Sequence, residues 1–228
     1  MEIYISIDGV LRNIIQKFDY HYYEAYFNSD VILNEEEKTD FEYAVIEPIQ
    51  NDNLLNSYKF QSKEEFENFL FIEYPIEIFG HAGLSYSTTF TDLHKILFDN
   101  PDHNFTLIGL DELGKAKPAS LFFLSKNGFL GNNIKFIKSD DIKNHWGNCD
   151  MWITDSKNIL DMCPENKIAI KFNTTYNQYF TYNKEITKLN EIQEIWLKSL
   201  ENHTTLTLTE SQKNVEQEEQ SPTKTEQK

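Results

Sequence analysis

The chain has 228 residues, with 37 Asp and Glu against 21 Lys and Arg, so its formal net charge is −16 with His neutral. A chain of this length predicts one domain, or one domain with an insertion, that can bury a sizeable core. The acidity argues against a protein that binds nucleic-acid backbones, because such a protein needs a basic face.

The sequence also argues against a membrane protein and against a secreted protein. No run of about 18 apolar residues occurs, so we expect no transmembrane helix and no membrane partner. The N-terminal stretch MEIYISIDGV lacks the basic region and the cleavage site of a secretory signal. Cys149 and Cys163 are the two cysteines, and two cysteines do not make a disulfide framework. We therefore expect a reducing, cytoplasmic location, in a cell or an infected host.

A short apolar strand is predicted at residues 3–7, with the sequence IYISI. Asp8 and Gly9 end this strand, and a helical pattern with Ile14 and Phe18 follows. In α/β folds, ligands bind beyond the carboxyl ends of the strands, which is where Asp8 is expected to lie. The alternative is a plain turn in which Asp8 caps the following helix.

Residues 19–100 show no clear alternation of strands and helices and are predicted to form a mainly helical insertion. One helix is expected at 62–73, where Ser62 and Glu65 have the spacing of a capping box. A second helix is expected at 91–98.

Four tyrosines gather at the start of this insertion: Tyr20, Tyr22, Tyr23 and Tyr26. Their helical spacing is compatible with burial of one helix face. An exposed tyrosine-rich surface would instead favour contacts with another protein. We therefore keep two alternatives, burial of one face and binding of an unknown protein partner through the insertion.

Strands and helices alternate after Pro101. Strands are predicted at 105–110, 133–137, 149–154 and 167–172. A helix begins near Pro118, with an apolar side formed by Leu121, Phe122 and Leu124. An amphipathic helix is predicted over 184–200. Short apolar strands in this order predict an α/β fold with a three-layer, doubly wound parallel sheet.

The end of the chain has a different composition. Residues 203–228 are rich in Gln, Glu, Thr, Ser and Lys and hold few large apolar side chains, so they cannot offset the entropy cost of ordering. We predict a disordered acidic tail there, a core formed by 1–18 and 101–202, and a cap-like insertion at 19–100.

Two acids are expected at the ends of parallel strands, Asp8 and Asp155. Acids placed in this way can share Mg²⁺, a cation that prefers oxygen ligands and often serves phosphate chemistry. Asp155 could instead cap the helix that follows it. A lysine could complete an anion site, and this half of the chain offers Lys115, Lys117, Lys138 and Lys143. Lysines such as Lys115 and Lys117 are ordinarily solvated, which is the alternative. Arg12, the one arginine, is expected at an exposed helix position, with anion binding as the alternative.

The residues IYISIDGVL resemble the first motif of the haloacid dehalogenase (HAD) superfamily, in which a strand runs into D-x-D-G-T/V. The residues DMWITDS resemble the fourth motif of that superfamily. Over about residues 1–13 and 104–177, the chain is similar to small phosphatases of the 5'-nucleotidase type. The resemblance implies a HAD-like, Rossmannoid core with a cap and a Mg²⁺-dependent phosphomonoester hydrolase.

The resemblance also implies roles for individual residues. Asp8 would act as general acid and base, Asp155 would bind Mg²⁺, and Lys115 or Lys117 would hold the phosphate. The position of the nucleophilic Asp, however, holds Ser6. A serine hydroxyl is a weak nucleophile without an adjacent base, and it removes one negative ligand from the metal site.

Two further positions depart from the HAD pattern. The second strand ends in Gly109-Leu110 without Ser or Thr, and the neighbour of Asp155 is Ser156. We therefore expect a degenerate HAD-like protein with little or no phosphatase activity and a binding or structural role. The alternatives are an active Mg²⁺-dependent phosphatase or 5'-nucleotidase-like hydrolase, and a phage virion or assembly component, since small divergent HAD-like chains resemble proteins of tailed phages.

Overall fold

The computed structural model describes residues 1–26, 54–129, 131–193, 195 and 196. One compact unit spans Met1–Asn190, and a second begins at Glu191. The sheet and the site described below belong to the first unit. The predicted tail at 203–228 lies outside the described residues. None of the helices in the described part of the chain combines the length and the apolar character that crossing a bilayer requires.

A six-stranded sheet forms the centre of the first unit, in the order β5-β4-β1-β6-β7-β8. All of its neighbouring strands pair in parallel. The strands are β1 (Glu2–Ser6), β4 (Asn104–Leu110), β5 (Ile134–Ile137), β6 (Met151–Thr154), β7 (Ile168–Phe172) and β8 (Glu185–Ile186). The predicted parallel α/β sheet is therefore confirmed, with the N-terminal strand between β4 and β6.

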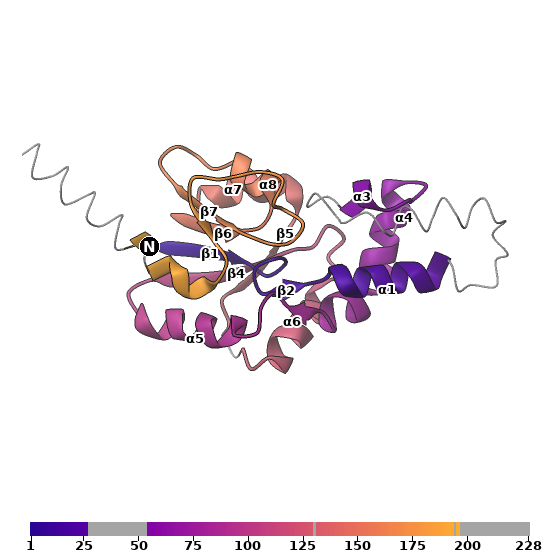
Figure 1. Cartoon of the computed structure of the whole chain (residues 1–228), viewed down its shortest axis with the longest axis horizontal. Helices are drawn as coiled ribbons and strands as arrows, with labels where there is room; N and C mark the ends of the chain where they lie inside the picture. Colours follow the sequence, from indigo (N-terminus) through magenta and orange to yellow (C-terminus); the bar gives the residue numbers. More distant parts are fainter. Residues whose placement is uncertain (27–53, 130, 194, 197–228) are drawn as a thin grey trace, which may run out of the picture. The chain divides into compact units, whose positions relative to one another are not determined.

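Helices cover both faces of this sheet (Figure 1). One face carries α7 (Ile142–Trp146) and α8 (Lys157–Asp161), and the opposite face carries α5 (Thr89–Asp99) and α6 (Lys117–Lys126). On the α7 face, Tyr4 packs edge-on against Trp152, with ring centroids 5.4 Å apart. These side chains belong to a buried apolar cluster that joins five strands to both helices. The three-layer arrangement follows from strands that are apolar on both faces.

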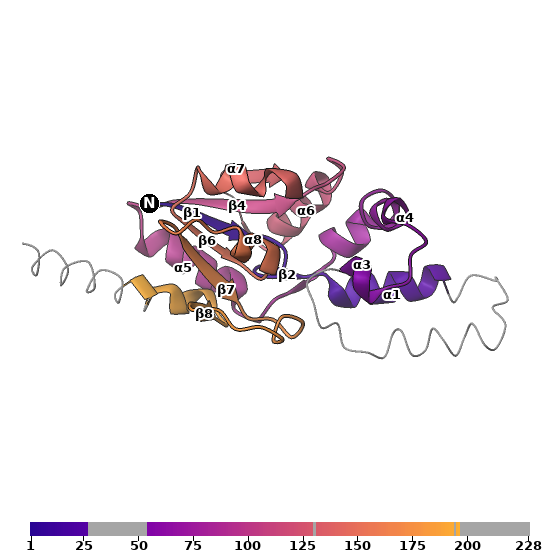
Figure 2. The same ribbon diagram turned by 90° about the horizontal axis from the view of Figure 1, so that it is seen from above.

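A short antiparallel ribbon brackets the segment from 14 to 82, which is called the insertion from here on; α5 falls within the predicted range of 19–100 but covers a face of the sheet. The strands of the ribbon are β2 (Arg12–Asn13) and β3 (Gly83–Leu84). Between them lie the described helices α1 (Ile15–Tyr26), α3 (Leu54–Ser57) and α4 (Lys63–Asn68), then the π-helical turns η1 (Phe69–Glu73) and η2 (Ile76–Gly80). Figure 2 shows α1, α3 and α4 grouped together beyond one end of the sheet.

The predicted cap of the 62–73 helix is present. The Ser62 hydroxyl accepts a hydrogen bond from the backbone N–H of Glu65 at 3.1 Å. The Glu65 carboxylate reaches one residue further back than expected and accepts from the backbone N–H of Gln61. The α-helix ends at Asn68, and the chain continues as the π-helical turn η1, which is wider than an α-helical turn.

Two sequence predictions about helices are wrong. Of the predicted apolar side of α6, Leu124 is buried as expected, but Leu121 and Phe122 are 38% and 43% exposed, and Ala119 and Phe123 pack inward in their place. The predicted helix at 184–200 begins instead with strand β8, which pairs with β7, and a 3-10 turn at Leu189–Glu191. Residues 197–200 lie outside the described part of the chain.

The four insertion tyrosines divide between core and surface. Tyr22 is buried, and its hydroxyl donates to the carbonyl oxygen of Lys59 at 2.8 Å. Tyr26 is half-buried and donates to the Glu65 carboxylate at 2.7 Å. Tyr20 and Tyr23 are exposed. The insertion therefore uses part of this set for its own aromatic core, and a protein partner bound through the exposed pair stays a prediction.

The buried Tyr22 predicts a pH dependence of folding stability. Burial raises its pKa to about 12, whereas a tyrosine in the unfolded chain ionises near pH 10. Since the unfolded state loses the proton first, this stabilisation is complete below about pH 10 and is lost as the pH rises toward about 12. Between about pH 9 and pH 12, the free energy of unfolding should therefore fall less for Tyr22→Phe than for the wild type. The difference between the two losses should be about 2 kcal/mol at most.

Urea denaturation at a series of pH values measures this difference. Tyr20→Phe is the matched control, because Tyr20 is exposed on the same helix and should keep the wild-type slope. Equal slopes for Tyr22→Phe and the wild type would contradict the prediction.

Candidate functional site

The turn after β1 places the predicted acid at the carboxyl edge of the sheet. Ser6 ends β1, and Asp8 forms an isolated β-bridge with Arg12 at the start of β2. The backbone N–H of Gly9 donates to the carbonyl oxygen of Arg12 at 2.9 Å and closes the turn. Gly9 has a φ of +76°, a left-handed conformation that costs glycine little.

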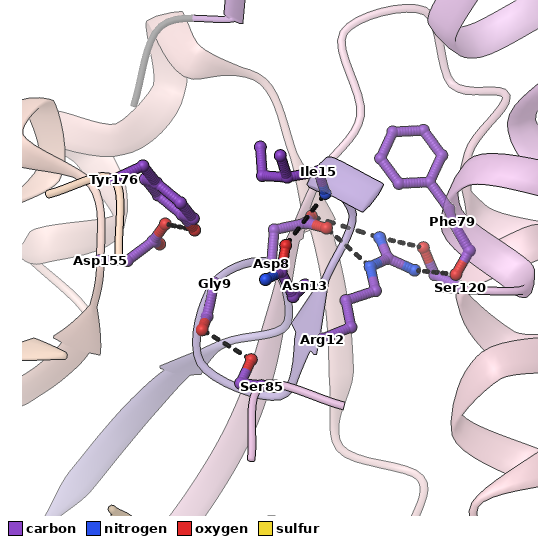
Figure 3. Close-up of polar contacts among 10 residues, drawn as sticks. All are labelled: Asp8, Gly9, Arg12, Asn13, Ile15, Phe79, Ser85, Ser120, Asp155 and Tyr176. Atoms are coloured by element: carbon purple, nitrogen blue, oxygen red, sulfur yellow. Dashed lines mark hydrogen bonds and ion pairs between the residues drawn. The ribbon is translucent and has the colours of Figure 1, made fainter. Parts of the chain in front are cut away.

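Arg12 is completely buried beside Asp8 (Figure 3). Its Nε donates to Asp8 Oδ1 at 2.6 Å, and its Nη2 donates to Asp8 Oδ2 at 3.2 Å. The guanidinium also donates to the Phe79 carbonyl oxygen at 3.1 Å and to Ser120 Oγ at 3.0 Å. The rings of Phe79 and Phe123 flank it, with centroids at 4.7 and 5.6 Å. The expectation of an exposed helical arginine is therefore wrong.

Asp155 lies on the other side of the turn, directly after β6, and only 8% of its surface is exposed. Its Oδ2 accepts a hydrogen bond from the Tyr176 hydroxyl at 2.6 Å. A Cβ atom on Gly9 would lie 1.9 Å from the carboxyl carbon of Asp155, so the glycine backbone packs directly against this carboxylate. Burial and the Asp155 carboxylate raise the pKa of Tyr176 well above its ordinary value, which keeps its hydroxyl a donor. The N-cap of α8 is Ser156, not Asp155.

Ser6, at the position of the HAD nucleophile, is 7% exposed. Its Oγ accepts a hydrogen bond from the indole Nε1 of Trp152 at 3.1 Å. An indole N–H only donates, so Trp152 cannot take a proton from the serine hydroxyl. The hydrogen bond therefore holds Ser6 as part of the packed core beside α7 and does not activate it.

A cavity of about 820 Å³ opens between the insertion and the carboxyl edge of the sheet. Asp8 is part of its lining, together with Phe66 and Leu70 from the insertion and Leu110 from the end of β4. A volume of this size is typical of sites that hold small organic ligands. The predicted position of chemistry therefore coincides with an opening that has Asp8 in its lining.

The two predicted phosphate-binding lysines lie elsewhere. The side chains of Lys115 and Lys117 are exposed, and neither lines the cavity. Their backbone N–H groups donate to the buried Asp111 carboxylate, at 2.8 and 3.1 Å, and so does that of Ala116 at 3.0 Å. This loop therefore holds its own acid in place at the start of α6, and a phosphate role for either lysine stays a prediction.

The arrangement of the two predicted metal ligands does not fit a shared Mg²⁺ ion. The carboxylate of Asp8 faces Arg12, whereas that of Asp155 faces Tyr176 (Figure 3). Each carboxylate thus already has a partner within the protein, and Ser6 supplies no third carboxylate. Among the described residues, no group of three or more His, Cys, Asp or Glu side chains could hold a metal ion. The metal role of Asp8 and Asp155 stays a prediction.

Sequence reasoning missed the partners that decide the state of this site. Tyr176 follows Asp155 by 21 residues, and Trp152 follows Ser6 by 146. Neither separation has a local signature. A signal did exist for Arg12, because an arginine that follows an acid by four residues across a turn can donate two hydrogen bonds to that carboxylate, as Arg12 does to Asp8.

Replacing Arg12 should strongly destabilise the fold. Arg12→Met leaves the half-buried Asp8 carboxylate, the Phe79 carbonyl oxygen and the Ser120 hydroxyl without their donor. We expect a loss of about 3–5 kcal/mol in the free energy of unfolding, measured by urea denaturation. Lys115→Met removes the same charge from an exposed position and should cost less than about 0.5 kcal/mol. A similar loss in both variants would contradict the structural role of Arg12.

Comparison with known proteins bears on the fold. No protein-family model matches the sequence, and no curated protein matches it. Among solved structures, a haloacid dehalogenase-like hydrolase from Burkholderia xenovorans aligns with a TM-score of 0.54 and 7% identity, over 87% of this chain and 97% of that chain.

Two further structures align less well. A haloacid dehalogenase-like hydrolase from Xanthomonas campestris gives a TM-score of 0.45 with 9% identity, over 84% of this chain and 92% of that chain. The HAD-hydrolase YfnB from Bacillus subtilis, solved with magnesium, gives a TM-score of 0.48 with 12% identity, over 85% of this chain and 97% of that chain. The HAD-like fold predicted from the two motifs is confirmed: this chain has the fold of the haloacid dehalogenase-like hydrolases.

Proposed function

We propose that the chain is a binding protein on a HAD-like fold, with little or no phosphatase activity. The observation that carries this proposal is the state of Ser6. Its hydroxyl is nearly inaccessible and accepts a hydrogen bond from Trp152, with no base in that interaction to activate it. In-line attack on a phosphate would need a nucleophile that reaches the cavity.

The neighbouring acid supports the same proposal. Both oxygens of Asp8 accept hydrogen bonds from Arg12. An acid that transfers a proton in a reaction must reach the substrate with that proton, and this pair would have to break first. If the Arg12 guanidinium moved away from Asp8, its hydrogen bonds to the Phe79 carbonyl oxygen and to Ser120 Oγ would also be disturbed.

The cavity supports a binding role. It keeps a volume of about 820 Å³ at the position where ligands of α/β folds bind. A protein with only a structural role would not need this opening between its insertion and its sheet. An active Mg²⁺-dependent phosphatase and a virion or assembly component stay predictions, as does the cytoplasmic location.

Phosphatase assays test the proposal. Hydrolysis of p-nitrophenyl phosphate and of a panel of nucleotides is measured with Mg²⁺ for the wild type, Asp8→Asn and Ser6→Asp. We expect wild-type turnover below about 0.01 s⁻¹, roughly a thousandfold under a typical enzyme, and no difference between the wild type and Asp8→Asn. Gain of turnover in Ser6→Asp would identify the missing carboxylate as the cause of the inactivity.

Wild-type turnover in the ordinary range that Asp8→Asn abolishes would refute the proposal. Circular dichroism of each variant serves as the folding control, since Asp8→Asn leaves the buried Arg12 without its counter-charge.

A further inference from the structure

The cavity over Asp8 has an apolar wall. The side chains that form it come from the insertion and from the end of β4: Leu54, Phe66, Leu70, Phe71, Phe79 and Leu110. Apolar and aromatic side chains of this kind bury the carbon skeleton of a small ligand. The wall therefore predicts a ligand with an apolar body.

The charged groups of the lining are mostly negative. Two lysines, Lys63 and Lys157, stand against five carboxylates. The carboxylates are Asp8, Glu67, Glu112, Asp140 and Asp161. With Arg12 behind Asp8 counted as a third cation, the surplus is two negative charges, which raises the local concentration of cations and disfavours a phosphate dianion.

Internal ion pairs occupy three of these five carboxylates. Asp8 is paired with Arg12, Glu67 with Lys63, and Asp161 with Lys157. The other two acids are Glu112 and Asp140, and no ion pair joins either of them to a basic side chain in the part of the chain that the structure describes. Their charge is thus available to a ligand at the mouth of the cavity.

One ammonium group already lies at this mouth. The Lys63 Nζ is 3.1 Å from Glu67 Oε1. Its pKa is raised by the hydrogen bond and charge of Glu67 and, more weakly, by the charges of Glu112 and Asp140. The Lys63 ammonium is therefore held at this acidic rim chiefly by Glu67.

We propose that this cavity binds an organic ammonium ion with an aromatic or aliphatic body, the body against the apolar wall and the ammonium between Glu112 and Asp140. The proposal rests on the proposed binding function and names its ligand class. Glu112 is held for this role, because its Oε1 accepts hydrogen bonds from the backbone N–H of Ser139, at 3.0 Å, and from the Ser139 hydroxyl.

Three probes that share one body separate the contributions. Isothermal titration calorimetry of the full-length protein is performed with 2-phenylethylammonium, 2-phenylethanol and 2-phenylethyl phosphate. We expect the ammonium to bind about tenfold more tightly than the alcohol, and the phosphate to bind more weakly than either.

Charge variants locate the ammonium. Glu112→Gln and Asp140→Asn should each weaken binding of 2-phenylethylammonium by about twofold to fivefold, and both together by more. Lys63→Met removes the competing cation and should tighten binding by a similar factor. Glu64→Gln is the matched control, because Glu64 lies on α4 with Lys63 and Glu67 but does not line the cavity.

The outcomes separate this inference from the proposed function. Equal affinity for all three probes, tighter binding of the phosphate, or no binding at all would overturn the ligand class and leave the absence of phosphatase activity standing. Hydrolysis of 2-phenylethyl phosphate that depends on Asp8 would refute the proposed function instead. Loss of ammonium binding in Glu64→Gln equal to that in Glu112→Gln would place the interaction outside the cavity and overturn the inference.

Discussion

One buried guanidinium holds the centre of this molecule together. A charge inside a protein is tolerated when it is paired and its donors are satisfied, and Arg12 meets both conditions through Asp8, Ser120 and the Phe79 carbonyl oxygen. These partners come from the turn after β1, from α6 and from η2. Hydrogen bonds from a single side chain therefore join the turn, the insertion and one helical layer, alongside the apolar cluster that contains Phe79 and Ala119.

The same region shows how a HAD-like fold satisfies its polar groups at the turn after β1. Each polar group around the turn has a partner within the protein: Asp8 has Arg12, Asp155 has Tyr176, and Ser6 has Trp152. Buried polar groups that are satisfied in this way contribute to stability, and they do not depend on a bound ion. The region can thus be retained by selection for folding alone, while the cavity beside it evolves toward a different ligand.

The sequence predicted what local patterns determine. The apolar runs of β1, β4, β6 and β7 lie within a residue or two of their expected positions, and α5 begins two residues early. Prediction failed where a distant partner decides the outcome. Ile186 fits a helical stripe, yet its segment pairs with Phe172 of β7 as a strand. In the site, Asp8 and Asp155 were identified from strand ends, whereas the direction of their carboxylates depends on residues that only the tertiary structure brings near.

The two-stranded ribbon of β2 and β3 has a consequence for how this architecture can diversify. Arg12 pairs with Leu84 and Asn13 with Gly83, so the chain leaves the core and returns to it through hydrogen-bonded neighbours. The ends of the intervening segment are held at a fixed, short separation whatever its length, and the entropy cost of closing a longer loop grows only slowly. Changes of length within this segment that keep η2 and its contact with Arg12 are therefore cheap for the core.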